Sequence, residues 1–321
     1  MSAFRGRLSF LIRLVVSVGL IGLAISRLDF DNMMRFLRRA DGALVAVTLV
    51  TVLADRALMA TRWILLLEAL EVHVPRLRVV KIFFLSTFFG SFLPSGIGGE
   101  AVRAVSFSRL SSRAVESVAS VVMDRVLGLL SMLLTGRLSL ALFYRVYPHP
   151  ALLAIVTGLS IGTIGGLALV LSKLLHERLR ARFREGTGRI AHWATKTVEA
   201  LARYRERLGT LSLVLVVSIF VQLLRVLQAF LLSESMALGV EVIYFLCFVP
   251  PILVVTMLPI SVGGWGTANV AYVVLFSQVG MDPDGAFVLS VLILALGVFG
   301  NLPGGFIYAW EGFAASERPA V

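Results

Sequence analysis

Charged residues are scarce in this sequence: Asp, Glu, Lys and Arg make up only 15% of its 321 residues, whereas hydrophobic residues make up 58%. Soluble domains carry roughly 25% charged residues. The mean hydropathy is +0.91. This composition excludes a soluble enzyme and a disordered tail, and it indicates an integral membrane protein.

Cysteine is nearly absent, because Cys247 is the single one and lies in an apolar run. This excludes an internal disulfide and a cysteine metal site. The four histidines show no His-x-x-x-His or Glu-partnered spacing, so we predict no metal. The Gly-rich stretches lack the Gly-Lys-Ser/Thr ending of a nucleotide-binding loop, which disfavours an ATP-driven pump. We therefore predict no cofactor.

Acidic residues are outnumbered: 19 Asp and Glu stand against 30 Lys and Arg, a net charge of +11. A topology with a cytoplasmic N-terminus places 19 basic residues in cytoplasmic pieces and 5 in external ones. This asymmetry favours that orientation, with both termini on the cytoplasmic side of a bacterial inner membrane. The stretch 173–209 holds ten Lys and Arg against four Glu. We expect it to be an amphipathic connector on the anionic leaflet, and nucleic-acid binding is disfavoured.

Long apolar runs predict an all-α polytopic membrane protein. Two other runs, 82–93 and 242–258, are too short or too rich in proline to cross a ~30 Å hydrocarbon core as straight helices. We expect a single transmembrane domain over 1–321, with two re-entrant hairpins at 82–110 and 242–280. The alternative is that each hairpin crosses the membrane twice. About six full spans are predicted near 8–26, 42–70, 117–136, 151–172, 210–232 and 285–310.

A short motif occurs twice, once in each predicted hairpin. Leu93-Pro94-x-x-Ile97-Gly98-Gly99 matches Leu258-Pro259-x-x-Val262-Gly263-Gly264. In the topology above, the two copies enter from opposite sides, which is typical of inverted repeats meeting near the bilayer midplane. The halves would be 8–172 and 210–310. Helix starts after Gly-Gly suit an anionic group; alternatively, the glycines serve only turns and close packing.

Several charged residues interrupt the apolar runs, at a cost of roughly 2.5–3.5 kcal/mol each on insertion scales. One interpretation is a polar cavity that receives a lipid head group; the other is a set of internal salt bridges that orient the helices. Five basic and three acidic candidates leave a balance of +2, which favours an anionic head group. They are Asp55, Arg56, Arg62, Glu100, Arg103, Asp124, Arg125 and Arg225.

These motifs resemble a known family. The segment Phe88 to Arg103, with Pro94 and Glu100, is similar to the first motif of the lysylphosphatidylglycerol synthase transmembrane-region (flippase-like domain) family. Arg62-Trp63, Asp124-Arg125-x-x-Gly128 and Pro259-x-x-x-Gly263-Gly264-Trp265-Gly266 are similar to weaker family patterns. The resemblance covers about 8–310. Members of the family often have an acidic residue where this chain has Asn269. We expect a stand-alone member, without the aminoacyl-transferring domain that follows in bifunctional members.

The duplicated motif and the intramembrane arginines favour a lipid translocase over an enzyme, moving a polar or anionic lipid between leaflets by alternating access. The resemblance implies the substrate class: a phospholipid, an isoprenoid-linked lipid or a hopanoid-type lipid. A membrane-embedded transferase using a polyprenyl-phosphate donor, with Glu100 or Asp124 as base, is one alternative. An accessory subunit of a lipid-synthesis complex is another; a second copy of the chain or a lipid-synthesis enzyme is then the expected partner. The predicted substrate-binding residues are Pro94, Gly98, Gly99, Glu100, Arg103, Pro259, Gly263, Gly264, Trp265, Asn269, Arg62, Asp124, Arg125 and Arg225.

Overall fold

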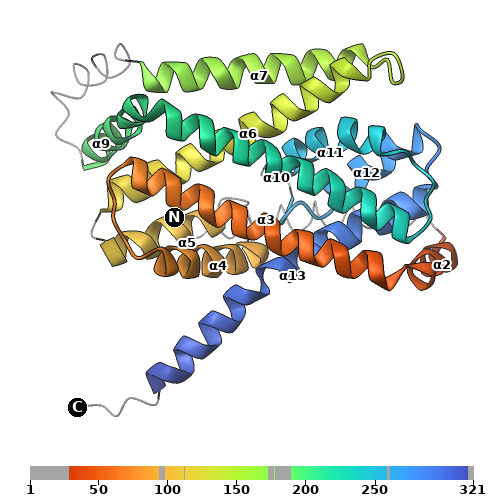
Figure 1. The fold of residues 1–321 in the computed structure, drawn as a ribbon, viewed down its shortest axis with the longest axis horizontal. Helices are drawn as coiled ribbons and strands as arrows, with labels where there is room; N and C mark the ends of the chain where they lie inside the picture. Colours follow the sequence, from red (N-terminus) through yellow and green to blue (C-terminus); the bar gives the residue numbers. More distant parts are fainter. Residues whose placement is uncertain are drawn as a thin grey trace, which may run out of the picture.

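The computed structural model describes residues 29–93, 98–111, 113–172, 177, 189–258 and 261–316, and its elements are all helical (Figure 1). The predicted first span near 8–26 lies outside these residues. The helices are α2 (Phe30–Arg39), α3 (Gly42–Ala69), α4 (Arg76–Phe92), α5 (Gly98–Ser111), α6 (Ala114–Leu142), α7 (Pro150–Leu171), α9 (Arg189–Arg203), the short 3₁₀ helix η1 (Tyr204–Arg207), α10 (Leu208–Ser235), α11 (Val242–Met257), α12 (Thr267–Ser277) and α13 (Pro283–Ser316).

Five helical stretches of the described residues are long and apolar enough to cross a membrane. They include α3, α6, α7, α10 and α13, which begin and end within a few residues of the predicted spans, apart from the C-termini of α6 and α13, which extend further. The protein is therefore a multi-pass membrane protein. Two of these helices begin at ordinary caps: at the start of α3 the side chain of Asp41 accepts a hydrogen bond from the Ala43 amide, and Pro150 opens α7.

The four helices of the predicted hairpins are shorter. α4 has 17 residues and α11 has 16, which at ~1.5 Å per residue falls short of a ~30 Å core. α4 begins at Arg76, earlier than the apolar run, because the helix continues through the basic residues that follow Pro75. α11 continues through Pro250 and Pro251, which pack against Gly136 of α6.

The helices of the second half follow the order of those in the first. α3 and α10 have 28 residues each, and α10 begins at Leu208, 166 residues after Gly42. α11 begins at Val242, 166 residues after Arg76 at the start of α4. The packing partners are exchanged accordingly: α4 packs on α13, whereas α11 packs on α6.

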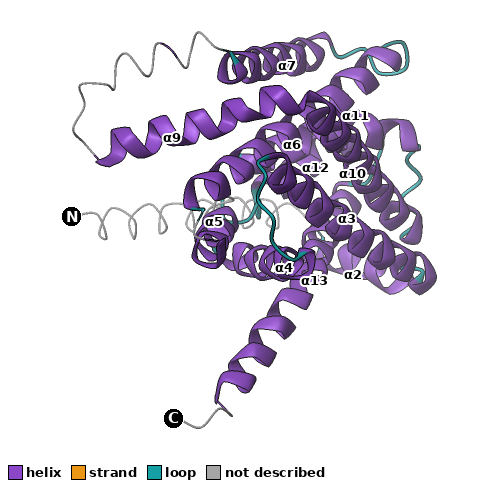
Figure 2. Ribbon diagram, turned by 60° about the vertical axis from the view of Figure 1, so that its left-hand side comes forward, coloured by secondary structure: helices purple, strands orange, loops and turns teal. Residues whose placement is uncertain are grey.

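The counterparts α3 and α10 lie side by side and run antiparallel (Figures 1 and 2). At one end the Asp41 amide donates to the Ser235 carbonyl oxygen, and at the other the Tyr204 hydroxyl donates to the Leu66 carbonyl oxygen. This pair joins the first half of the chain to the second. α7 lies at the outside of the bundle and is mostly exposed, and the C-terminal part of α13 projects away from the other helices (Figure 1).

Two apolar clusters fill the bundle. One contains Trp63 and Phe107, whose rings meet edge to face at 5.3 Å, and it joins α3, α4 and α6 to η1 and the start of α10. The other contains Phe245 and Phe276 with centroids 4.7 Å apart, and it joins α10 to α11, α12 and α13. Each hairpin is thus held by a hydrophobic contact region of its own.

The predicted connector 173–209 is described only in part. α9 is an amphipathic helix that packs on α6 and α7. Leu201 near the C-terminus of α9 and Tyr204 at the start of η1 are buried. The described end of the connector is therefore anchored in the bundle rather than only resting on a surface.

Candidate functional site

A cavity of about 400 Å³ lies inside the bundle, between the two hairpins and the α3–α10 pair. Helices of both halves contribute to its wall. Its polar lining combines charged and uncharged side chains, namely Thr48, Asp55, Arg56, Ser86, Thr87, Ser91, Glu100, Arg103, Asp124, Arg225, Gln228, Trp265, Tyr272 and Asn301. A cavity with this lining inside a membrane protein is a candidate binding site.

The first hairpin closes by backbone contact. A Cβ atom on Gly99 would lie 2.7 Å from the Ser86 carbonyl oxygen, and one on Gly90 would lie 2.9 Å from the Gly99 Cα. Only glycine therefore lets α4 and α5 approach so closely. This contact places Glu100 and Arg103, which follow on α5, at the cavity wall.

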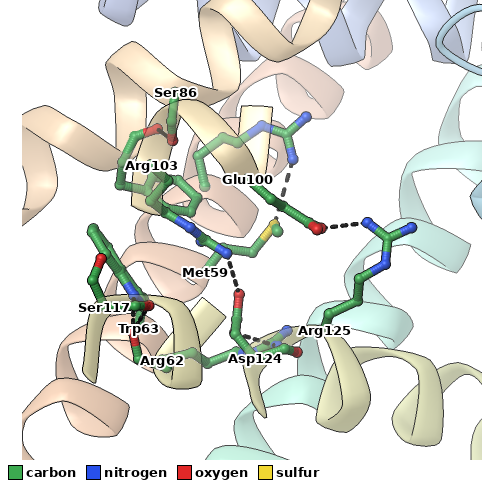
Figure 3. A network of polar contacts seen from close by, with 12 residues as sticks. Met59, Arg62, Trp63, Ser86, Glu100, Arg103, Ser117, Asp124 and Arg125 are labelled. Carbon is green, nitrogen blue, oxygen red and sulfur yellow. Dashed lines mark hydrogen bonds and ion pairs between the residues drawn. The ribbon is translucent and has the colours of Figure 1, made fainter. Parts of the chain in front are cut away.

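Asp124 on α6 is shared by two arginines (Figure 3). Arg62 Nη2 donates to its Oδ1 at 2.7 Å and to its backbone oxygen at 2.9 Å, and Arg103 Nη2 donates to its Oδ2 at 3.1 Å. The Arg103 guanidinium also lies over the Trp63 ring, 5.0 Å from its centroid. All three charged side chains are buried, so each ion pair acts in a medium of low dielectric constant.

Asp55 on α3 forms a second group of the same composition. Arg56 Nη1 donates to its Oδ2 at 2.7 Å, and Arg225 Nε from α10 donates to its Oδ1 at 3.0 Å. Arg225 Nη2 also contacts the Met59 sulfur at 3.1 Å, and Arg56 Nη2 donates to the Gly297 carbonyl oxygen of α13 at 3.2 Å. Asp55 therefore joins the two halves at the centre of the bundle.

The third acidic group is Glu100, which accepts a hydrogen bond from Arg125 Nη1 (Figure 3). Arg125 Nη2 also reaches the Met257 carbonyl oxygen at the end of α11, at 3.5 Å. Asp124 and Arg125 are adjacent in sequence, yet they have different partners because neighbouring residues of a helix point in different directions.

The charges of the site do not cancel. Asp55 and Asp124 each pair with two arginines, whereas Glu100 pairs with one. These five arginines and three carboxylates therefore retain a net charge of +2. Among the described residues, the Nε atoms of Arg56 and Arg103 are buried without a hydrogen-bond partner. The arrangement can therefore accept an additional anionic group with little rearrangement.

The second hairpin tip lies against the first. Gly263, Gly264 and Gly266 have φ angles of +59°, +84° and +91°, which only glycine adopts without strain. A Cβ atom on Gly263 would lie 3.9 Å from the Ser91 carbonyl oxygen of α4, and Trp265 lines the cavity. The two turns thus meet at the site.

Residues 10–304 match the family model described as the transmembrane region of lysylphosphatidylglycerol synthase. The chain belongs to this family. No curated protein matches the sequence closely enough to serve as a relative. The family match, with the apolar helices, makes this a membrane protein of a lipid-related family, and the resemblance read from the motifs is confirmed.

The structure brings half of the predicted site residues to the cavity wall. These are Gly99, Glu100, Arg103, Asp124, Arg225, Gly263 and Trp265. Others lie close behind it: Arg62 and Arg125 are ion-paired to wall residues. Gly98 and Gly264 belong to the tips without lining the cavity. Pro94 and Pro259 lie outside the described residues.

Asn269 is fully buried, and its side chain bonds to the start of its own helix and to α13. Its Oδ1 accepts from the Gly266 amide at 2.8 Å, and its Nδ2 donates to the Ser290 hydroxyl of α13 at 2.6 Å. The chain thus has a helix-capping amide where the family resemblance implies an acid. Its role in binding remains a prediction.

Gln228, Ser91 and Asn301 line the cavity but were not among the predicted binding residues. Gln228 and Asn301 are polar residues inside strongly apolar helices, and this is the only signal that the sequence carries for them. Ser91 and Asn301 join the halves, because Asn301 Nδ2 donates to Ser91 Oγ at 2.8 Å. Within the described ranges, no group of three or more His, Cys, Asp or Glu could hold a metal ion.

Proposed function

We propose that this protein is a lipid translocase that moves a polar or anionic lipid between the two leaflets. The observation that carries the proposal is the arginine-rich cavity at the meeting point of the two hairpins. Intramembrane charges are expensive, so a set with an excess of +2 is retained where it meets a charged or strongly polar ligand. A cavity of about 400 Å³ fits a lipid head group, with the acyl chains remaining in the bilayer.

An inverted repeat supports transport by alternating access. Two halves of opposite orientation would produce three features of this fold: helix starts 166 residues apart, the antiparallel α3–α10 pair and the exchanged packing partners. Arg103–Asp124 and Asn269–Ser290 add a matched pair of links: each joins the second helix of a hairpin to the next long helix, across 21 residues. The halves would rock around the fixed tips.

The transferase alternative requires a free carboxylate base. Glu100 is ion-paired with Arg125, and Asp124 accepts from two arginines. The hydrogen-bonding oxygens of both carboxylates are therefore already engaged by guanidinium groups. The geometry therefore favours translocation.

Proteoliposomes with a trace of acyl-chain-labelled fluorescent phospholipid test the proposal. Dithionite bleaches only the outer leaflet, so protein-free vesicles lose about half of the signal, and we expect protein-containing vesicles to lose nearly all of it. Arg225→Ala, at the cavity, should slow the exchange, while Arg39→Ala, on the exposed end of α2, should not. If neither phosphatidylglycerol nor phosphatidylcholine label crosses the bilayer faster than in empty vesicles, the proposal fails.

A further inference from the structure

The charges of the cavity wall are divided unequally between the two halves. Five of the six charged wall residues precede residue 172, and only Arg225 comes from the second half. The second half contributes uncharged polar groups instead, among them Gln228, Tyr272 and Asn301. A ligand in the cavity therefore meets mostly charged groups from the first half and, apart from Arg225, uncharged polar groups from the second half, which we call the neutral wall.

The same difference exists between equivalent positions. In the 166-residue register of α3 and α10, Gln228 is the second-half equivalent of Arg62. Asn269 and Ser290 form the link that Arg103 and Asp124 form in the first half. The second half thus repeats the architecture of the charged group with neutral hydrogen-bonding side chains.

Two atoms on this neutral wall lack partners within the described structure: Gln228 Nε2 and Asn301 Oδ1 are buried and make no hydrogen bond. Leaving such a buried amide group unpaired is unfavourable. A ligand hydroxyl suits both, because it donates and accepts, whichever way each amide is turned.

We infer that the second-half wall is a separate subsite for an uncharged, hydroxyl-bearing part of the lipid head group, with Gln228 and Asn301 determining specificity. The inference rests on the proposed function and assigns separate roles to the two sets of residues. The first-half arginines bind the anionic group of the lipid, and the two amides select its hydroxyl groups.

Native mass spectrometry of the purified protein tests this with two lipids of identical acyl chains. Phosphatidylglycerol carries two hydroxyls on its head group, and phosphatidylpropanol carries the same phosphodiester and three carbons with none. We expect phosphatidylglycerol to bind about tenfold more tightly, because each neutral hydrogen bond contributes a few-fold in affinity.

Gln228→Met and Asn301→Leu keep the side-chain size and remove the amide, so each should lower phosphatidylglycerol affinity several-fold and leave phosphatidylpropanol unchanged. Gln222→Met is the matched control, since Gln222 is a buried amide of the same helix that donates to Ser131 and does not line the cavity. Equal affinity of the two lipids for the wild type, or equal loss of both in the variants, overturns the inference alone. Retention of neither lipid by the wild type overturns the proposed function as well.

Discussion

Asp124 shows at the scale of single residues how a membrane protein stabilises buried charge. One carboxylate accepts from Arg62 and Arg103, each on a different helix, and all three groups are nearly inaccessible to solvent. Removing the shared acid would leave two guanidinium groups without a counter-charge in a low-dielectric environment.

We therefore predict that Asp124→Asn lowers the stability by about 3–5 kcal/mol, seen as an earlier thermal transition in detergent. Asp31→Asn, on the exposed first turn of α2, is the matched control and should change little. Combining Asp124→Leu with Arg103→Met should recover part of the loss, because it removes one unpaired charge along with the acid. An unchanged transition in Asp124→Asn would contradict an energetic role for the shared acid.

At the scale of elements, the first hairpin depends on the contact between α4 and α5, and the glycines there have no room for a side chain. Gly158, by contrast, lies on the exposed helix α7, and a Cβ atom added there would meet nothing within 4 Å. The same substitution at these two positions separates packing from helix propensity.

We predict that Gly99→Ala destabilises the protein by about 1–3 kcal/mol, because its Cβ would meet the Ser86 carbonyl oxygen and force the backbones apart. Gly158→Ala should be neutral or stabilising by up to about 1 kcal/mol, since alanine favours the helix. Thermal unfolding in detergent and the yield of monodisperse protein measure both. Equal effects of the two substitutions would contradict this prediction, because they would show that α4 and α5 can move apart at no cost in stability.

At the scale of the whole molecule, the first half is held to the rest of the chain at both ends of the bundle, by contacts of different strength. At one end, exposed ion pairs connect Arg207 to Glu71 and Arg203 to Glu116. At the other end, Asp284 accepts from the Asn32 side chain at 2.6 Å and is largely buried. Exposed pairs are weak, typically up to about 1 kcal/mol, so we expect the ion-paired end to open first.

Cysteine labelling tests this. In a Cys247→Ala background the chain has no other thiol, and Ser91→Cys places one on the cavity wall. Glu71→Gln with Glu116→Gln should raise labelling by a membrane-impermeant reagent from one side of the membrane, and Asp284→Ala from the opposite side. Labelling from the same side in both variants would contradict alternating access between these two ends.

Sequence alone predicted the all-helical membrane fold and five of the long helices within a few residues of their starts, because apolar length against bilayer thickness is a local property. It also located the tip motifs, since Gly and Pro mark breaks wherever they occur. The start of α4 was placed too late, because Arg76 and its basic neighbours hide a helix from a hydropathy criterion.

Which charges pair with which was decided only by the tertiary structure. A charge inside an apolar helix is costly to bury, so the sequence indicates that each one needs a partner. It does not indicate which partner, because Arg62 and Asp124 lie 62 residues apart, and Asp55 and Arg225 lie 170 apart. Their pairing depends on how α3, α6 and α10 cross, and on glycines that let the hairpins approach the centre. The neutral wall of the cavity has the same origin: Gln228 and Asn301 are single polar residues in apolar helices, and only packing places both on the wall of one cavity.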